Sequence, residues 1–304
     1  MSLLSVVLPA FNEEAMLPRA AKVLGGLLEK EKIDYELVFV DDGAKDLTWS
    51  EILTAHKQNE KVHGVHFSRN FGKEAAIFAG LAAAKGDCVA VMDCDLQHPP
   101  ETLVQMYRLW ESGYEVVEGL KARRGKESGA HRAAAGAVYK IMSRATKIDM
   151  SRASDFKLLD RRAVNTLLDM PEQNAFFRAM RSWIGFRRTQ VEFDVREREA
   201  GSSQWSTRKL IRYAISNIAG YSAAPMQFVT WAGIVFLAFA IILGIQTLVR
   251  YFSGRAVEGF TTVILLVLLT GSIIMISLGI IGYYVARIYE EAKRRPRYIV
   301  SRTV

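Results

Sequence analysis

The chain has 304 residues, half of them apolar, and its 40 Lys and Arg outnumber 32 Asp and Glu to give a formal net charge of +8. A chain of this length can form one sizeable domain and a smaller one without disulfide bonds. It has only two cysteines, Cys88 and Cys94, so neither a disulfide framework nor a zinc cluster is expected. This cysteine content fits a reducing compartment. The positive charge favours an anionic partner. It does not distinguish between a nucleotide, a phospholipid surface and nucleic acid.

The N-terminal run LLSVVLPA is apolar and has no basic residues before it. It leads at once into Asn12, Glu13 and Glu14, so it indicates a first strand and not a signal peptide. Residues 1 to about 205 continue to alternate apolar runs with helical patterns, which predicts one domain over this range.

Further strands are expected at YELVFVDDG, VHGVHFS and DCVAVMDCD, separated by helices at about 14–30, at about 48–59 and at KEAAIFAGLAAA. Pro99 and Pro100 can start the next helix, because a missing N–H costs nothing in the first turn. The alternation predicts an α/β domain of parallel βαβ units that binds its ligands at the carboxyl ends of the strands.

Acidic residues follow two of these strands. Asp93 and Asp95 end the fourth strand, and Asp41 and Asp42 end the second. Carboxylates at i and i+2 are oxygen ligands suited to Mg²⁺, which takes one or two of them with water and phosphate completing its shell. We therefore expect a metal and nucleotide site here, with His98 at the helix start or on a diphosphate, not on the metal.

Two basic amphipathic segments, residues 129–148 and 206–220, have helical spacing. Such helices lie in a membrane interface or pack on the sheet, and the sequence leaves both open for the first. The second adjoins an apolar segment, which favours the interface and predicts a juxtamembrane helix at 206–225.

Residues 226–249 and 260–286 contain no Asp, Glu, Lys, Arg or His. As helices at about 1.5 Å per residue, both are long enough to span about 30 Å of hydrocarbon, so residues 226–304 are expected to form a transmembrane hairpin with a basic tail. The tail, residues 287–304, is richer in Lys and Arg than the connection between the spans. The positive-inside bias therefore predicts a cytoplasmic tail and N-terminal domain, in a multi-pass protein of the inner membrane.

The ordered segments SVVLPAFNEE, VFVDDG, FSRNFGKEAA, MDCDLQHPPE, SDFKLLDRR and REREAGSSQWSTRKL, followed by two apolar spans, resemble family 2 glycosyltransferases of the polyisoprenyl-phosphate branch. The resemblance covers nearly the whole chain. It implies a GT-A fold, a Rossmann-like and mostly parallel sheet, in residues 1–205. It also implies transfer of glucose or a related sugar from UDP-glucose to undecaprenyl phosphate, Mg²⁺ or Mn²⁺ as cofactor, and a homo-oligomer, by family a tetramer. GDP-mannose as donor stays open.

Roles in the family can be carried over to matching positions. Nucleotide contacts would come from the first two strand ends, from the FSRNFGKEAA segment and from the REREAGSSQW loop: Pro9, Glu13, Asp41, Asp42, Arg69, Lys73, Asp93, Arg196, Arg198 and Ser203. Asp93, Asp95 and Gln97 would hold the metal. One position departs from the family pattern, because Gln204 stands where a lysine often follows the serine. If that lysine holds the acceptor phosphate, Arg198 or Lys209 must compensate.

The resemblance makes Asp155 the foremost catalytic candidate, beside Asp95. A phosphate monoester has its second pKa near ~6, so a phosphate acceptor needs no base at neutral pH. Asp155 is then expected to orient sugar hydroxyls or the acceptor, with base catalysis as the alternative.

Two rival functions fit the sequence less well. A processive polysaccharide synthase usually shows a Q-x-x-R-W segment and more membrane helices, whereas this chain has RAMRSW at 178–183 and one hairpin. A membrane-anchored scaffold or nucleic-acid module would suit the net charge, but anionic lipid headgroups explain the basic residues around the spans better. We therefore expect lipid and nucleotide partners and no nucleic acid.

Overall fold

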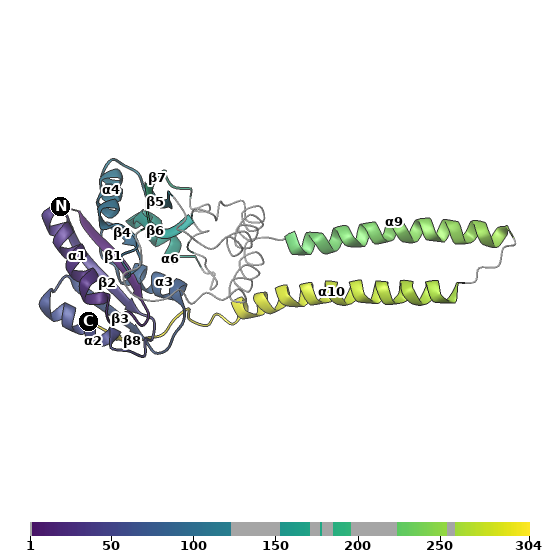
Figure 1. Cartoon of the computed structure of the whole chain (residues 1–304), viewed down its shortest axis with the longest axis horizontal. Helices are drawn as coiled ribbons and strands as arrows, with labels where there is room; N and C mark the ends of the chain where they lie inside the picture. Colours follow the sequence, from purple (N-terminus) through teal and green to yellow (C-terminus); the bar gives the residue numbers. More distant parts are fainter. Residues whose placement is uncertain (1, 123–152, 171–176, 178–184, 196–223, 254–258) are drawn as a thin grey trace. The chain divides into compact units, whose positions relative to one another are not determined.

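The structure is a computed structural model that describes residues 2–122, 153–170, 177, 185–195, 224–253 and 259–304 (Figure 1). It divides into two compact units. Unit 1 consists of Met1–Ile211 and Arg295–Val304, and unit 2 of Arg212–Arg294. The amphipathic segments expected at 129–148 and 206–220 fall outside the described residues.

Unit 1 is built on one eight-stranded sheet with the order β7-β5-β6-β4-β1-β2-β3-β8. Strands β1 to β4 are mutually parallel, whereas β6 runs antiparallel to β4 and β5, and β8 antiparallel to β3. The strands are β1 (Leu3–Ala10), β2 (Asp34–Asp41), β3 (Val62–Phe67), β4 (Cys88–Val91), β5 (Val116–Lys121), β6 (Ala153–Asp160), β7 (Arg188–Phe193) and β8 (Val300–Thr303).

Helices cover both faces of this sheet. One apolar cluster joins the sheet to three helices, α1 (Leu17–Lys30), α2 (Thr48–Gln58) and α4 (Pro100–Glu111). A second cluster joins the opposite face to α3 (Lys73–Ala83) and α6 (Arg161–Leu168). The strands between these layers are buried on both faces, which is why they read as continuous apolar runs and not as alternating ones.

The strand order places a topological switch at β1. The chain passes from β1 to β2 and β3 on one side, then crosses back to add β4 on the other side. Open α/β sheets bind ligands in the crevice outside the carboxyl ends of the strands at such a switch. Because β6 is antiparallel to β4, with Lys157 opposite Val91, the start of β6 lies at the same edge of the sheet.

The expected elements before Glu111 are found with small shifts. Helix α1 begins at Leu17, later than expected, with Pro18 in its first turn. Strand β4 ends at Val91, so Asp93 and Asp95 lie in the loop after it and not within the strand.

The end of the C-terminal tail belongs to a different unit from the one that the sequence predicts. The sequence predicts that residues 226–304 form the hairpin with its tail, but residues 295–304 belong to unit 1, and β8 within them pairs with β3. The end of the tail, Val300–Thr303, is therefore part of the sheet.

Unit 2 contains two long helices, α9 (Ala224–Phe252) and α10 (Phe260–Ala292), which run beside each other (Figure 1). Within them, Val229–Gln246 and Leu269–Ala292 are apolar enough and long enough to cross a membrane. Both windows are wholly unburied, unlike the core helices of a soluble protein. The two predicted apolar spans are therefore found as helices that can cross a bilayer.

Candidate active site

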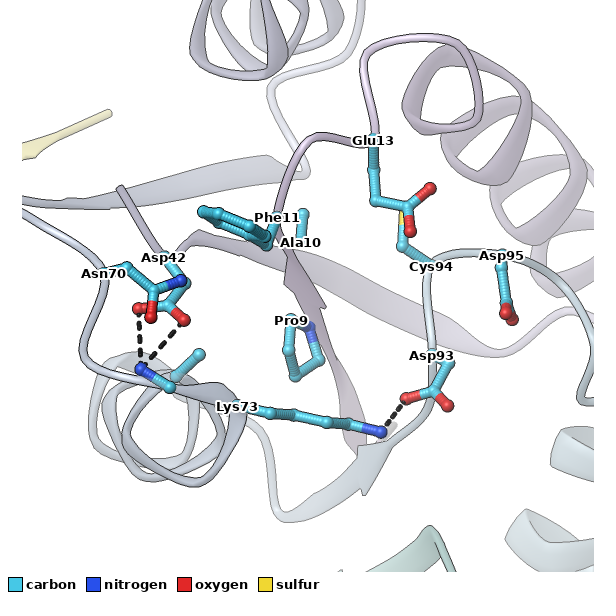
Figure 2. A pocket seen from close by; sticks show the side chains of 12 residues that line it. Pro9, Ala10, Phe11, Glu13, Asp42, Asn70, Lys73, Asp93, Cys94 and Asp95 are labelled. Carbon is cyan, nitrogen blue, oxygen red and sulfur yellow. Dashed lines mark hydrogen bonds and ion pairs between the residues drawn. The ribbon is translucent and has the colours of Figure 1, made fainter. Parts of the chain in front are cut away.

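A cavity of about 310 Å³ opens at the carboxyl edge of the sheet, at the switch between β1 and β4 (Figure 2). Its walls come from the end of β1, the loop after β4, the turn after β2 and the start of α3. The lining residues are Pro9, Ala10, Phe11, Glu13, Asp42, Asn70, Gly72, Lys73, Ala76, Asp93, Cys94 and Asp95.

The loop after β4 carries the two acids. Asp93 and Asp95 both line the cavity, and the Asp95 carboxylate accepts a hydrogen bond of 3.1 Å from the backbone N–H of Gln97. Leu96, between Asp95 and Gln97, has a left-handed backbone with φ 55°. A non-glycine residue in that region costs about 1–3 kcal/mol and persists only where its surroundings hold it, as at many functional sites.

His98 supports this loop from the protein interior. Its ring is almost completely buried, stacks on Phe156 at 4.8 Å and meets Phe193 edge-on at 5.4 Å. Its Nδ1 accepts a hydrogen bond of 3.2 Å from the backbone N–H of Asp93. His98 thus lies at the helix start, as expected, directly before Pro99 at the N-cap of α4, and its internal contacts position Asp93.

Lys73, at the start of α3, joins an acid of the loop after β4 to an acid of β6. Its Nζ lies 2.5 Å from Asp93 Oδ1 and 2.8 Å from Asp155 Oδ2, and its side chain extends across the cavity toward Asp93 (Figure 2). The side chain of Asp155 is only 4% exposed, and this ammonium compensates its buried charge. The antiparallel β6 brings Asp155 here, although 62 residues separate it from Asp93 in the sequence.

The electrostatics of the cluster favour the ionised form of Asp93. Burial alone would raise the pKa of Asp93, but the Lys73 ammonium outweighs it and holds that pKa below its usual range. Burial lowers the pKa of His98, so the ring is neutral at neutral pH, which fits its role as a hydrogen-bond acceptor. The site therefore presents the negative carboxylate of Asp93 beside the ammonium of Lys73.

The turn after β2 is tied to the start of α3. The Asp42 carboxylate accepts hydrogen bonds from the backbone N–H groups of Phe71, at 2.6 Å, and Gly72, at 2.9 Å. Burial raises the pKa of Asp42, and these two donors partly offset that rise. Asp42 thus shapes the cavity wall as well as lining it.

Asp41 and Arg69 are also predicted nucleotide contacts. Asp41 is fully buried, and it accepts hydrogen bonds from the backbone N–H of Ala44 and, through Oδ2, from His66 Nδ1 at 2.8 Å. The Arg69 guanidinium lies 4.0 Å from the centre of the Phe71 ring. Neither residue is among those that line the cavity.

Arg196, Arg198 and Ser203, together with Gln204 and Lys209, lie outside the described residues. Asn70, which the sequence offers for a diphosphate or nucleotide together with Arg69 and Lys73, lines the cavity, as do Phe11 and Cys94, which were not among the predicted contacts. Each follows a predicted strand within a few residues, and that position was an available signal.

Among the residues that the structure describes, no group of three or more His, Cys, Asp or Glu is arranged to hold a metal ion. The carboxylates of Asp93 and Asp95 line the cavity and still fit Mg²⁺ or Mn²⁺, since such ions in nucleotide sites take one or two carboxylates and complete their shell with water and phosphate, whereas Gln97 is not among the lining residues. The residues present are thus compatible with a metal that binds together with a diphosphate.

The fold and the cavity define a class of protein. The sheet order, with a mostly parallel centre and an antiparallel β6, is that of GT-A glycosyltransferases. Glucosyl-3-phosphoglycerate synthase from Mycobacterium tuberculosis, solved with Mn²⁺, UDP and glucosyl-3-phosphoglycerate, superposes with a TM-score of 0.50 at 21% identity, covering 72% of this chain and 78% of that chain. At 21% identity this structural similarity shows only that the two proteins share a fold.

Sequence comparison shows the family. Residues 5–178 match the family described as Glycosyl transferase family 2. The uncharacterized glycosyltransferase YkcC of Bacillus subtilis is 36% identical, over 98% of this chain and 93% of that protein. The prophage bactoprenol glucosyl transferase homolog of Escherichia coli is 34% identical, over 98% of each. The chain belongs to glycosyl transferase family 2, which confirms the resemblance seen in its motifs.

Proposed function

We propose that this glycosyltransferase moves a hexose, with inversion at the anomeric carbon, from a nucleoside diphosphate sugar to a polyisoprenyl phosphate. The observation that carries the proposal is that Lys73, Asp93 and Asp95 line one cavity, with buried Asp155 ion-paired to Lys73 beside it. The relative named as a bactoprenol glucosyl transferase homolog supports glucose as the sugar and undecaprenyl phosphate as the acceptor. UDP-glucose is then the donor.

The nucleotide would lie along the ends of β1 and β2, against Pro9, Glu13 and Asp42. Arg69 is exposed in the neighbouring loop and is available to phosphate, and Asp41 would act by holding the turn. Arg196, Arg198 and Ser203 would close over the phosphates, as the resemblance implies. A UDP complex of the similarly folded M. tuberculosis synthase supports a nucleotide in this class of fold.

Asp93, Asp95 and Gln97 would hold Mg²⁺ or Mn²⁺ together with the diphosphate. A bound divalent ion would offset the negative charge that develops on the leaving group. The Mn²⁺ in the M. tuberculosis synthase complex supports this assignment.

In the transfer itself, a phosphate oxygen of the acceptor forms a bond to the anomeric carbon, and the bond from that carbon to the diphosphate oxygen breaks. The electron pair of the broken bond leaves with the nucleoside diphosphate. The acceptor phosphate is already largely ionised at neutral pH, because its second pKa is near ~6. Asp155, ion-paired to Lys73, then orients the sugar or the acceptor and takes no proton.

The chain path supports a membrane enzyme with both ends on one side. Strands β1 to β7 precede the two apolar helices, β8 follows them, and all eight strands belong to one sheet. A chain that crosses a bilayer and returns to the same sheet must cross an even number of times. With the positive-inside bias, the catalytic unit and the C-terminus are then cytoplasmic, and the site faces the headgroup of a lipid acceptor. The homotetramer implied by the resemblance belongs to the same proposal.

The test supplies the purified protein, in nanodiscs containing undecaprenyl phosphate, with radiolabelled UDP-glucose and Mg²⁺. We expect label to move into the organic phase and to be displaced by unlabelled UDP-glucose more effectively than by GDP-mannose. Stronger competition by GDP-mannose would make the protein a mannose transferase. No label in lipid, together with retained binding of DNA or a protein partner, would contradict the transferase and support a membrane-anchored binding module.

A further inference from the structure

The C-terminal segment Arg297–Val304 is fastened along the outer edge of the sheet. Strand β8 pairs antiparallel with β3, with Thr303 opposite Val65. Beyond the strand, Gly64 and Val304 exchange two backbone hydrogen bonds of 2.9 and 3.0 Å. At the other end, the backbone N–H of Ser68 donates to the carbonyl of Ile299 at 3.1 Å. The segment therefore holds β3 up to the first residue of the loop 68–72.

An aromatic chain extends from this segment to the cavity wall. Tyr298 stacks on Phe67 with the ring centres 5.1 Å apart and the planes at 12°. Phe67 is fully buried and meets Phe71 edge-on at 5.7 Å. The backbone N–H of Phe71 in turn donates to the carboxylate of Asp42, which lines the cavity. The Tyr298 ring is thus two ring contacts and one hydrogen bond away from a cavity-lining group.

A second residue of the segment reaches the helix that carries Lys73. The guanidinium of Arg297 lies 4.4 Å from the centre of the Phe78 ring on α3, and it also donates to the carbonyl of Met170 at 2.7 Å. The segment therefore contacts both elements that form this side of the cavity, the loop 68–72 and α3.

Covering a sheet edge explains only part of this arrangement. A short edge strand protects the open hydrogen-bonding groups of its neighbour, and β8, exposed and polar, suits that task. Tyr298 and Arg297 precede the strand, however, and their side chains contact residues next to the cavity. Edge protection alone requires neither contact.

We propose that the segment Arg297–Val304 is a positioning part of the donor site. It holds the loop 68–72, and through it Asp42 and the start of α3, in the arrangement that binds a nucleoside diphosphate. This inference rests on the proposed function for the identity of the ligand. Since only residues 293–296 separate the segment from α10, it also ties the donor site covalently to the apolar hairpin.

The first test measures the donor site directly. Full-length protein in nanodiscs is titrated with UDP in the presence of Mg²⁺, and the KM values for UDP-glucose and for undecaprenyl phosphate are measured separately. We expect Tyr298→Ala to weaken UDP binding and raise the donor KM by about 10-fold, with the acceptor KM unchanged. Tyr298→Phe keeps the stacked ring and should behave as the wild type.

Two controls separate positioning from a general loss of stability. Tyr107→Ala removes a buried ring of α4 in the other apolar cluster, and Ser301→Ala alters an exposed position on β8. Both should retain the UDP affinity of the folded protein. A wild-type donor KM and UDP affinity in Tyr298→Ala, or an equal loss in Tyr107→Ala, would overturn the inference.

A second readout does not depend on the ligand. Amide hydrogen exchange of residues 68–74 should be faster in Tyr298→Ala than in Tyr298→Phe, because the amides of Phe71 and Gly72 are those bonded to Asp42. Unchanged exchange would overturn the positioning role. If exchange rises but the wild type binds no UDP, the proposed function fails while the mechanical link stands.

Discussion

At the scale of single residues, Lys73 is the side chain on which the site depends most. Its ammonium lies within ion-pair distance of both Asp93, in the loop after β4, and Asp155, in β6. The Lys73 side chain is partly exposed, but Asp155 is buried, so removing Lys73 takes a compensating charge away from a buried carboxylate, which is unfavourable. Lys73 therefore has a structural effect on the acids in addition to any contact with phosphate.

Replacing Lys73 by Met should lower kcat/KM by about 100-fold, equivalent to about 2.7 kcal/mol of transition-state stabilisation. The reason is that the two carboxylates would repel each other and turn away from the cavity. Lys73→Arg keeps the charge and should lose much less. Steady-state kinetics with UDP-glucose checks both, and equal losses in the two variants would contradict a role based on charge.

Asp155 is buried and ion-paired to Lys73, which suits it to orient the sugar or the acceptor phosphate. We expect Asp155→Asn to lower kcat by a factor that is the same throughout about pH 6.5 to 8.5, because a phosphate acceptor needs no proton removed. The pH–rate profile of variant and wild type measures this. Loss of a pH-dependent limb in the variant alone would show that Asp155 is a general base.

At the scale of elements, the turn after β2 depends on a glycine. Gly43 has φ +65°, and a Cβ there would collide with the backbone of Arg69. The turn and the loop 68–72 can therefore approach closely only without a side chain at this position. Their closeness keeps Asp42 within reach of the amides that it binds.

Gly43→Ala should destabilise unit 1 by about 1–3 kcal/mol and weaken nucleotide binding, because of backbone strain and the collision. Gly26→Ala is the matched control, since Gly26 is exposed within α1 and a methyl group there would meet nothing within 4 Å. It should stabilise the protein by about 0.5–1 kcal/mol. Thermal unfolding measures both changes, and a Gly43→Ala protein as stable as the wild type would refute the close-approach argument.

At the scale of the whole molecule, we propose that the hairpin places the reaction at the cytoplasmic face of a membrane. If both ends of the hairpin are cytoplasmic, residues near its tip lie on the far side of the membrane. Ser253→Cys, at the end of α9, should then react with an impermeant maleimide in right-side-out vesicles. Ser301→Cys, on β8, should react only after permeabilisation. The native Cys88 and Cys94 are buried and contribute little background.

The opposite labelling pattern, with Ser301→Cys accessible and Ser253→Cys protected, would reverse the proposed orientation. Labelling of both positions in sealed vesicles would contradict a hairpin that crosses the membrane twice.

The central strands and the two apolar helices could be predicted from the sequence, because burial on both faces or in lipid produces long apolar runs. Strand β6 could not, since ASDFKLLD places Asp155 and Lys157 in buried positions where charges are unusual. Strand β8 is short, polar and far along the chain from its partner β3, so no local pattern indicates it.

The candidate site, like the fold, could be predicted from the sequence only in part. Asp93 and Asp95 directly follow an apolar strand, so their place at the carboxyl edge follows from the parallel sheet. The pairing of Lys73 with Asp155 depends on the antiparallel direction of β6, which local sequence does not encode.

The central claim is that the carboxylates at this edge act with a divalent cation to transfer a hexose to a lipid phosphate. Mass spectrometry of the lipids extracted after incubation with UDP-glucose, undecaprenyl phosphate and Mg²⁺ tests it most directly. We predict a hexosyl-phosphate lipid that disappears when the cation is chelated and returns when Mg²⁺ is added in excess. An undiminished yield of the same lipid with all divalent cations chelated would contradict the account.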